Sequence, residues 1–231
     1  MSGSTQTSVK LQFSDKYGRE HALNYFRKHQ ASLARRLSNW RDMQIARKAL
    51  RLAGEPELVL DLPCGAGRFW PVLTENPKRV VIAADNSTDM LAVARSMQPP
   101  ELLDRVQTMQ TSAFAIDLPD ASVDSVFCMR LMHHVGESEH RQLMLREMHR
   151  VSRDTLILSL WVDGNLKAWR RRRLEERRAR RGEKAYQNRF VIPADVVEAE
   201  FRHSGWELVA RLDFLPRYAM WRTYVLRKTS R

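Results

Sequence analysis

The sequence predicts one α/β domain built around a mostly parallel β-sheet. Two observations carry this prediction. Beyond Gly54, short apolar or β-branched runs alternate with helical patterns, which is the order of βαβ units whose sheet is covered on both faces. The chain has 231 residues, 43% of them hydrophobic, so it has the size of one domain with a buried core, and a wholly disordered chain is excluded.

The first 55 residues are expected to divide into a flexible polar N-terminus at 1–12 and a helical segment at 13–55. Ser14 offers an N-cap, and apolar residues then recur at mostly helical spacings. Gly54 ends this pattern, so the sheet is expected to begin after it.

Residues 56–161 are expected to form the core of the domain. Strands are placed where Val, Ile and Leu cluster, and helices where apolar residues recur every three or four positions. In chain order the expected elements are strand 58–62, helix 68–75, strand 79–84, helix 87–97, strand 106–110, strand 123–129, helix 139–151 and strand 155–161.

An Arg-rich insertion at 162–190 follows the core, and a helix and a strand pair at 191–231 close the chain. The stretch 165–182 has many helix formers and no β-branched residue, which predicts a helix. Pro193 is suited to begin the next helix. Two final strands at 206–212 and 218–226 are separated by a short linker that favours antiparallel pairing.

The positive charge of the chain is concentrated in the insertion. The whole chain carries 39 Lys and Arg against 27 Asp and Glu, a net charge of +12, and residues 166–189 hold eleven of the basic residues against three glutamates. Three interpretations stay open: a solvated helix face, a site for a phosphorylated substrate or lipid headgroup, and a site for nucleic acid or a nucleotide effector. The candidate anion-binding residues are Arg170, Arg172, Arg173, Arg177, Arg178 and Arg181.

Several kinds of protein are excluded by features that the sequence lacks. No apolar run approaches the roughly 18 residues of a membrane helix, and residues 1–10 lack the apolar segment of a secretory signal. Cys64 and Cys128 have no metal-ligand spacing and cannot form a disulfide framework, so we expect no metal and a cytoplasmic location. Neither a P-loop nor a complete G-x-G-x-x-G dinucleotide motif occurs.

The most informative stretch is Val59-Leu60-Asp61-Leu62-Pro63-Cys64-Gly65-Ala66-Gly67-Arg68-Phe69. It predicts a strand that runs into a turn of small residues, where the backbone can approach a ligand closely. The next expected strand ends at Asp85, whose carboxylate is placed to accept the two hydroxyls of a ribose. A turn that merely packs a helix on a strand is the alternative.

Four stretches resemble, in order and spacing, the motifs of class I S-adenosylmethionine-dependent methyltransferases. Residues 59–69 resemble the first motif, and 81–91 the ribose-binding motif. Residues 118–126 resemble the approach to the fourth strand, and 131–135 the Val-Leu-His-His that follows it. The resemblance covers about residues 57–160 and specifies the superfamily rather than the substrate.

This resemblance implies a Rossmann-like sheet of seven strands in the order 3-2-1-4-5-7-6, with strand 7 antiparallel and residues 13–55 as a helical lid over the cofactor. It implies methyl transfer from S-adenosylmethionine. Asp61, Cys64, Gly65 and Gly67 would line the methionine moiety together with the turn residue Pro63, and Asp85 would hold the ribose. The remaining cofactor-binding residues it implies are Asn86 and Met90, Ser112, Ala113 and Phe114 around the adenine, and Met129 and Arg130 at the end of strand four.

Two departures from the family pattern keep a second class open. Pro63 replaces the usual first glycine and has no N–H to donate, and Phe114 stands where an acidic residue often contacts the adenine amine. A degenerate fold that acts as a regulatory binding protein is therefore an alternative. His134, or His133 beside it, is the candidate general base, and the alternative is that one histidine caps a helix and the other packs beneath it.

A fainter resemblance, in the N-terminal helices, residues 161–165 and the strand pair near Trp221, is to bacterial methyltransferases found beside lipopolysaccharide-core kinases. It implies a cell-envelope acceptor, a kinase partner and peripheral association with the inner membrane. An R-x-x-x-R spacing in the insertion resembles arginines that bind cyclic-di-GMP, which adds a nucleotide effector. A similar motif set occurs in methyltransferases that modify the wobble uridine of tRNA, so tRNA is the second candidate acceptor.

Overall fold

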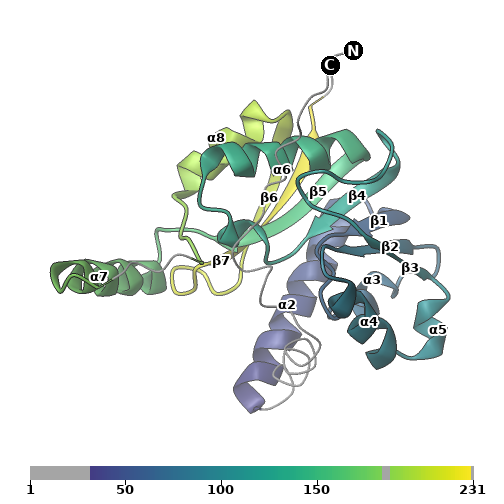
Figure 1. The fold of residues 1–231 in the computed structure, drawn as a ribbon, viewed down its shortest axis with the longest axis horizontal. Coiled ribbons are helices and arrows are strands. Elements are labelled where there is room, and N and C mark those ends of the chain that lie inside the picture. The colour runs from purple at the N-terminus through teal and green to yellow at the C-terminus, as the bar shows by residue number, and fades with distance from the viewer. Residues whose placement is uncertain (1–31, 184–187, 230–231) are drawn as a thin grey trace.

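The computed structural model describes residues 32–183 and 188–229, and its centre is one seven-stranded sheet in the order β3-β2-β1-β4-β5-β7-β6 (Figure 1). β1 to β5 pair in parallel, and β7 is antiparallel to both β5 and β6. The predicted strand order and the antiparallel seventh strand are confirmed. The strands are β1 (Leu58–Asp61), β2 (Val80–Asp85), β3 (Val106–Gln110), β4 (Val123–Cys128), β5 (Ser152–Trp161), β6 (Trp206–Asp213) and β7 (Trp221–Lys228).

Helices cover both faces of the sheet, and each face has its own apolar core. On one face α6 and α8 pack on the sheet, and on the other α2, α3 and α4 do so (Figure 1). This two-sided burial explains why the central strands are apolar along their length. The helical elements are α2 (Leu33–Leu52), α3 (Trp70–Leu73), α4 (Thr88–Met97), α5 (Pro100–Leu103), the 3-10 turn η2 (Met132–His134), α6 (Ser138–Val151), α7 (Leu166–Arg180) and α8 (Ala194–His203).

The predicted helix at 68–75 is wrong in length, because α3 spans only Trp70–Leu73. The glycine turn occupies the residues before it, and Gly65 and Gly67 take φ values of +55° and +71° that no right-handed helix contains. Other bounds differ as well, and β7 spans Trp221–Lys228 rather than the expected 218–226. β5 begins at Ser152, where it pairs with Val123, and the short helix α5 lies in a stretch for which no element was predicted.

The N-terminal helix α2 has two unlike halves. Leu33, Leu37 and Trp40 in its first half are 80%, 66% and 56% exposed, whereas its second half packs against the sheet from Ile45 onward. Its N-cap is Ser32, whose hydroxyl accepts a hydrogen bond from the N–H of Arg35. The predicted N-cap at Ser14 and residues 1–31 lie outside the described residues, so the flexible terminus and the lid stay predictions.

The basic helix α7 projects away from the sheet (Figure 1). The predicted helix is confirmed, with Asn165 as the N-cap that accepts the N–H of Ala168 at 2.9 Å. Ala168 is the only buried residue of α7, so the helix contributes little to the core. Within 32–183 and 188–229, no helix is both long enough and apolar enough to cross a membrane.

A buried ion pair joins α6 to α8. The Arg141 guanidinium donates to both carboxylate oxygens of Glu200, at 2.9 and 2.6 Å, and each side chain is about 5% exposed. Arg141 also donates to the carbonyl oxygens of Val135 and Gly136 in the loop after η2. The pair therefore fixes the loop that carries the two histidines as well as the two helices.

We expect Glu200→Ala to lower the free energy of unfolding by about 3–5 kcal/mol, because it leaves the Arg141 guanidinium buried without its carboxylate. Urea unfolding measures the change. The matched control is Asp154→Ala, which breaks the exposed pair with Arg227 and should cost less than about 1 kcal/mol. Similar losses in the two variants would contradict the structural role given to the buried pair.

Candidate active site

The glycine turn lies at the edge of the sheet where the parallel strands end, between β1 and α3. The N–H of Cys64 donates to the carbonyl of Ala84 at 2.8 Å, which ties the turn to the neighbouring strand β2. Gly65 lies in the left-handed region, and a Cβ placed there would meet the Met90 methyl group at an ordinary 3.5 Å. At Gly65 the glycine is therefore required by backbone conformation.

Gly67 has a second reason to be glycine. A Cβ at this position would lie 2.9 Å from the indole ring of Trp70, which is fully buried. The implied role of Gly65 and Gly67 in lining the methionine moiety stays a prediction.

Asp85 is the last residue of β2, and its side chain contacts the glycine turn. Its carboxylate accepts the N–H of Gly65 at 3.0 Å and the N–H of Ser87 at 2.9 Å. Burial raises the pKa of Asp85, and the hydrogen bonds from Ser87, Gly65 and Asn86 oppose that rise. A carboxylate has acceptor capacity for about four hydrogen bonds, so these three bonds leave capacity for a ligand hydroxyl.

Asp61 is the most unusual group at this edge. It is 1% exposed, and the hydrogen-bonding group that acts on its carboxylate is the side chain of Trp70. Burial raises the pKa of Asp61 well above its usual value, the side chain of Trp70 offsets part of the rise, and the charge of Asp85 adds to it. Trp70 offers this buried carboxylate only a neutral donor, and a cation brought beside it would relieve the remaining cost of burial.

Cys64 is a structural residue of the turn rather than a nucleophile. It is 5% exposed, and burial together with the charges of Asp61 and Asp85 raises the pKa of its thiol well above the ordinary value. A thiol in these surroundings stays protonated and unreactive. Among the described residues, no group of three or more His, Cys, Asp or Glu is placed to hold a metal ion.

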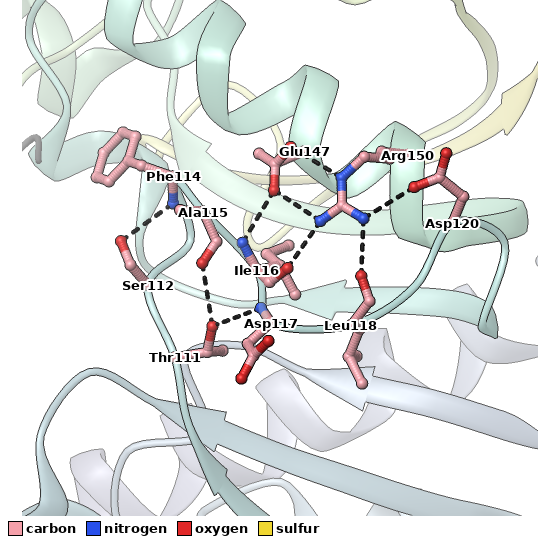
Figure 2. A network of polar contacts seen from close by, with 10 residues as sticks. All are labelled: Thr111, Ser112, Phe114, Ala115, Ile116, Asp117, Leu118, Asp120, Glu147 and Arg150. Atoms are coloured by element: carbon pink, nitrogen blue, oxygen red, sulfur yellow. Dashed lines mark hydrogen bonds and ion pairs between the residues drawn. The ribbon is translucent and has the colours of Figure 1, made fainter. Parts of the chain in front are cut away.

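The loop between β3 and β4 carries the residues expected near an adenine, and α6 holds it in place (Figure 2). Arg150 donates to the carbonyl oxygens of Ile116 and Leu118 at 2.7 Å each, and Glu147 accepts the N–H of Ile116 at 2.9 Å. Within the loop the Ser112 hydroxyl accepts the N–H of Phe114. The loop is thus tethered to α6 by a charged pair that sequence analysis did not single out.

The predicted adenine-side residues differ in exposure. Ala113 and Met90 are buried, and Asn86 is exposed at the end of β2. The Phe114 ring lies edge-on to the His140 ring of α6, with 6.3 Å between the centroids. Their contact with an adenine ring stays a prediction.

Asp42 of the N-terminal helix α2 connects the end of β4 to the glycine turn through two ion pairs. Met129 is buried, and Arg130 has a φ of +65° and donates its backbone N–H to the Ser159 hydroxyl. The guanidinium groups of Arg130 and Arg68 both donate to the same oxygen of Asp42, which is 5% exposed. Sequence analysis missed Asp42, because a lone acid on a helix resembles a solvated residue.

His133 and His134 lie in η2, just beyond β4. His133 is 3% exposed, and burial, aided by the charges of His134 and nearby arginines, lowers its pKa to about 2. His134 is half-buried, its Nδ1 lies 2.5 Å from the carbonyl oxygen of Asn188, and burial also lowers its pKa. His133 is therefore the weaker base of the two.

The arginines of the insertion separate into two groups. Most of the predicted anion-binding residues, Arg170, Arg172, Arg173, Arg177 and Arg181, are exposed, and the half-buried Arg178 pairs with Glu183 at 2.9 Å. Two arginines that sequence analysis did not select, Arg171 and Arg189, lie over the ring of Trp161 at the end of β5. Helical periodicity could not reveal this, because the apolar residues of α7, Leu166, Trp169 and Leu174, are exposed and do not mark the side that faces the sheet.

Comparisons with known proteins agree with this geometry. Residues 59–155 match the family model described as a methyltransferase domain. Two proteins of Schizosaccharomyces pombe, an uncharacterized methyltransferase-like protein and an uncharacterized methyltransferase, are 33% and 32% identical over 100 and 97 residues, which is 43% and 42% of this chain. The matched stretches span only 36% and 35% of those relatives.

Solved structures extend the likeness to almost the whole chain. Magnesium protoporphyrin IX methyltransferase from Synechocystis, solved with bound S-adenosylhomocysteine, superposes with a TM-score of 0.72 at 14% identity over 95% of this chain and 100% of that one. A methyltransferase of Thermotoga maritima gives 0.61 at 16% identity over 91% and 98%. The chain therefore has the fold of class I S-adenosylmethionine-dependent methyltransferases, and its residues 59–155 are similar to the methyltransferase-domain family.

Proposed function

We propose that the protein transfers a methyl group from S-adenosylmethionine to an anionic acceptor. The observation that carries the proposal is Asp61, a carboxylate that is 1% exposed and has the neutral side chain of Trp70 as its hydrogen-bonding neighbour, at the edge where this fold binds ligands. S-adenosylmethionine, when bound, supplies a methyl group on a positively charged sulfur. A cationic ligand suits a site in which the charges of Asp61 and Asp85 act together on the Cys64 thiol of the turn.

The residues of this edge would hold such a ligand through complementary groups. Asp61 would face its positive charge, and Asp85 would accept hydroxyl groups while Gly65 and Ser87 keep the carboxylate in place. Met90 would bring an apolar contact beside the turn. Orientation of two reactants can lower a barrier by roughly 7–11 kcal/mol, so positioning is the main contribution expected of these residues.

His134 is the histidine that suits a general base. It is more exposed than His133, and the contact with Asn188 raises its pKa against the effect of burial. His133, held neutral among aromatic rings, would orient its neighbours rather than take a proton in the reaction. A base is needed only when the acceptor carries a proton to remove.

A regulatory protein of the same fold is the second candidate. Pro63 has no N–H to donate, and Phe114 stands where an acidic residue often contacts the adenine amine, so two features that would bind a ligand in the family pattern are altered. Both features are compatible with weaker cofactor binding. A titration with the cofactor therefore separates the two candidates.

We also propose that the outward arginines of α7 bind a phosphate-bearing partner. Arg170, Arg173 and Arg177 share a face of α7 with the exposed apolar side chains of Leu166, Trp169 and Leu174. A lipopolysaccharide, tRNA and cyclic-di-GMP all supply phosphate groups, and arginine binds phosphate through two parallel hydrogen bonds. A cell-envelope acceptor, a kinase partner and peripheral membrane association stay predictions from the sequence.

The function is tested by calorimetric titration with S-adenosylmethionine and S-adenosylhomocysteine. Asp85→Asn should weaken both ligands about tenfold or more, because hydrogen bonds to a carboxylate are lost. Asp61→Asn should weaken S-adenosylmethionine more than its uncharged-sulfur product, since a charge opposite the sulfonium is removed. Asp154→Asn, at an exposed pair, is the control. Absence of binding by folded wild-type protein would contradict the proposal and favour a regulator.

The lowered pKa of His133 predicts a pH dependence of stability. The folded protein keeps His133 neutral, whereas the unfolded chain takes up a proton below about pH 6.5, so stability falls as the pH drops. Between pH 7 and pH 5, wild type should lose about 2 kcal/mol more free energy of unfolding than His133→Phe, which keeps a ring at this position. Exposed His203→Phe should retain the wild-type slope. Equal slopes for wild type and His133→Phe would refute a buried neutral histidine.

Charge reversal on α7 tests the partner. The variant Arg172→Glu, Arg173→Glu, Arg177→Glu should weaken binding of purified lipopolysaccharide, total tRNA or cyclic-di-GMP at least tenfold, because phosphate contacts are lost. Its affinity for S-adenosylmethionine should be unchanged. The strongest wild-type ligand among the three identifies the partner class. If the variant binds that ligand as tightly as wild type does, these arginines form only a solvated face.

A further inference from the structure

Two tryptophans and a histidine form an aromatic group at the edge of the sheet that bears the glycine turn. Trp161 ends β5 and lies opposite Trp221, which begins β7; their ring centroids are 5.5 Å apart. The ring of His133 packs against both, at 5.0 Å from Trp161 and 4.8 Å from Trp221. This group lies on the opposite side of β4 from the glycine turn of β1.

Three guanidinium groups converge on these rings from three parts of the chain. Arg130, after β4, lies 4.5 Å from the centroid of Trp221. Arg171 of α7 and Arg189 of the following segment lie 5.1 and 5.9 Å from the centroid of Trp161. We call the set the arginine–tryptophan cluster: Arg130, Arg171, Arg189, Trp161, Trp221 and His133.

The backbone brings Arg189 to this position and holds it there. The N–H of Ile192 donates to the carbonyl oxygen of Trp161 at 3.0 Å, and that of Phe190 donates to His133 at 2.7 Å. Arg171 in turn donates to the carbonyl oxygen of Arg189 at 3.0 Å. Both ends of the insertion thus lie beside the sheet, and its Arg171 and Arg189 face the ring of Trp161.

Two buried polar atoms of the cluster have no hydrogen-bond partner among the described residues. They are Nε1 of Trp161, which is 8% exposed, and Nδ1 of His133, which is 3% exposed. The indole nitrogen can only donate, so it requires an acceptor. Buried polar groups are nearly always satisfied in functional states, and a ligand oxygen would complete this one.

The charge of the cluster selects the kind of ligand. Its three guanidinium groups are accompanied by Asp42, shared between Arg130 and Arg68, and by Glu175, which pairs with Arg171 at 2.9 Å. The cluster itself contains no carboxylate. Arginine forks and an indole N–H, gathered beside apolar rings, are suited to an oxyanion attached to an apolar group.

We propose that the arginine–tryptophan cluster is the acceptor subsite, and that it binds a carboxylate or phosphate group of the molecule to be methylated. This inference rests on the proposed function. It assigns substrate recognition to Arg171 and Arg189 at the sheet edge and leaves the outward arginines of α7 to a separate partner. The subsite and the glycine turn flank β4, so an acceptor held by its anionic group reaches toward the cofactor side of the edge.

The test uses the full chain and three probes: benzoate, phenyl phosphate and the neutral benzamide. Each is titrated up to about 10 mM, with and without saturating S-adenosylhomocysteine, and followed by ligand-observed NMR. Benzoate or phenyl phosphate should bind at least tenfold more tightly than benzamide, and the better of the two identifies the oxyanion. Arg171→Gln with Arg189→Gln should abolish this preference and leave the affinity for S-adenosylhomocysteine unchanged.

The matched control is Arg180→Gln with Arg202→Gln, which removes two positive charges from exposed sites on α7 and α8 and should retain the preference. Equal affinity for charged and neutral probes, no binding of either anion, or an equal loss in the control variant would each overturn the subsite. Failure of S-adenosylhomocysteine to bind, with the anion preference intact, would instead overturn the proposed cofactor and leave the anion site standing.

Discussion

The pairing of one carboxylate, that of Asp42, with both Arg68 and Arg130 is the interaction on which the geometry of the site depends. Asp42 lies in α2, Arg68 lies at the end of the glycine turn, and Arg130 follows β4. One buried carboxylate thus connects three segments that the chain separates by 26 and 88 residues. A buried ion pair contributes little net stability, but removal of one partner is costly, so the contact specifies one arrangement rather than strengthening the fold.

That arrangement divides charge across the functional edge of the sheet. On one side of β4, Asp61 and Asp85 are buried near the glycine turn; on the other, Arg130, Arg171 and Arg189 surround the tryptophans. A cationic donor and an anionic acceptor would each meet the opposite sign. The low dielectric of a buried edge would strengthen the attraction of the donor to the aspartates and of the acceptor to the arginines. It would also disfavour the reverse placement of the two ligands, in which like charges meet.

Local sequence signals predicted the parts of this architecture that depend on neighbours in the chain. The strand order followed from the methyltransferase motifs, and Gly65 and Asp85 were found from a turn and a strand end. The signals failed where three-dimensional packing decides. Gly67 is glycine because Trp70 packs on it, and the predicted helix at 68–75 was too long because the turn continues to Phe69. Arg171 and Arg189 could not be told from their neighbours, since charge density does not reveal which side chains face the sheet.

Because α7 buries so little of its surface, its two ends differ in how far their sequence can change. Because only Ala168 of this helix is buried, its outer turns can change in length and composition without disturbing the sheet. The base of the insertion, where Arg171 and the segment ending at Ile192 meet Trp161, has no such freedom. The outer turns of this helix could therefore diverge in sequence among relatives of this protein while the residues at the strand ends are retained.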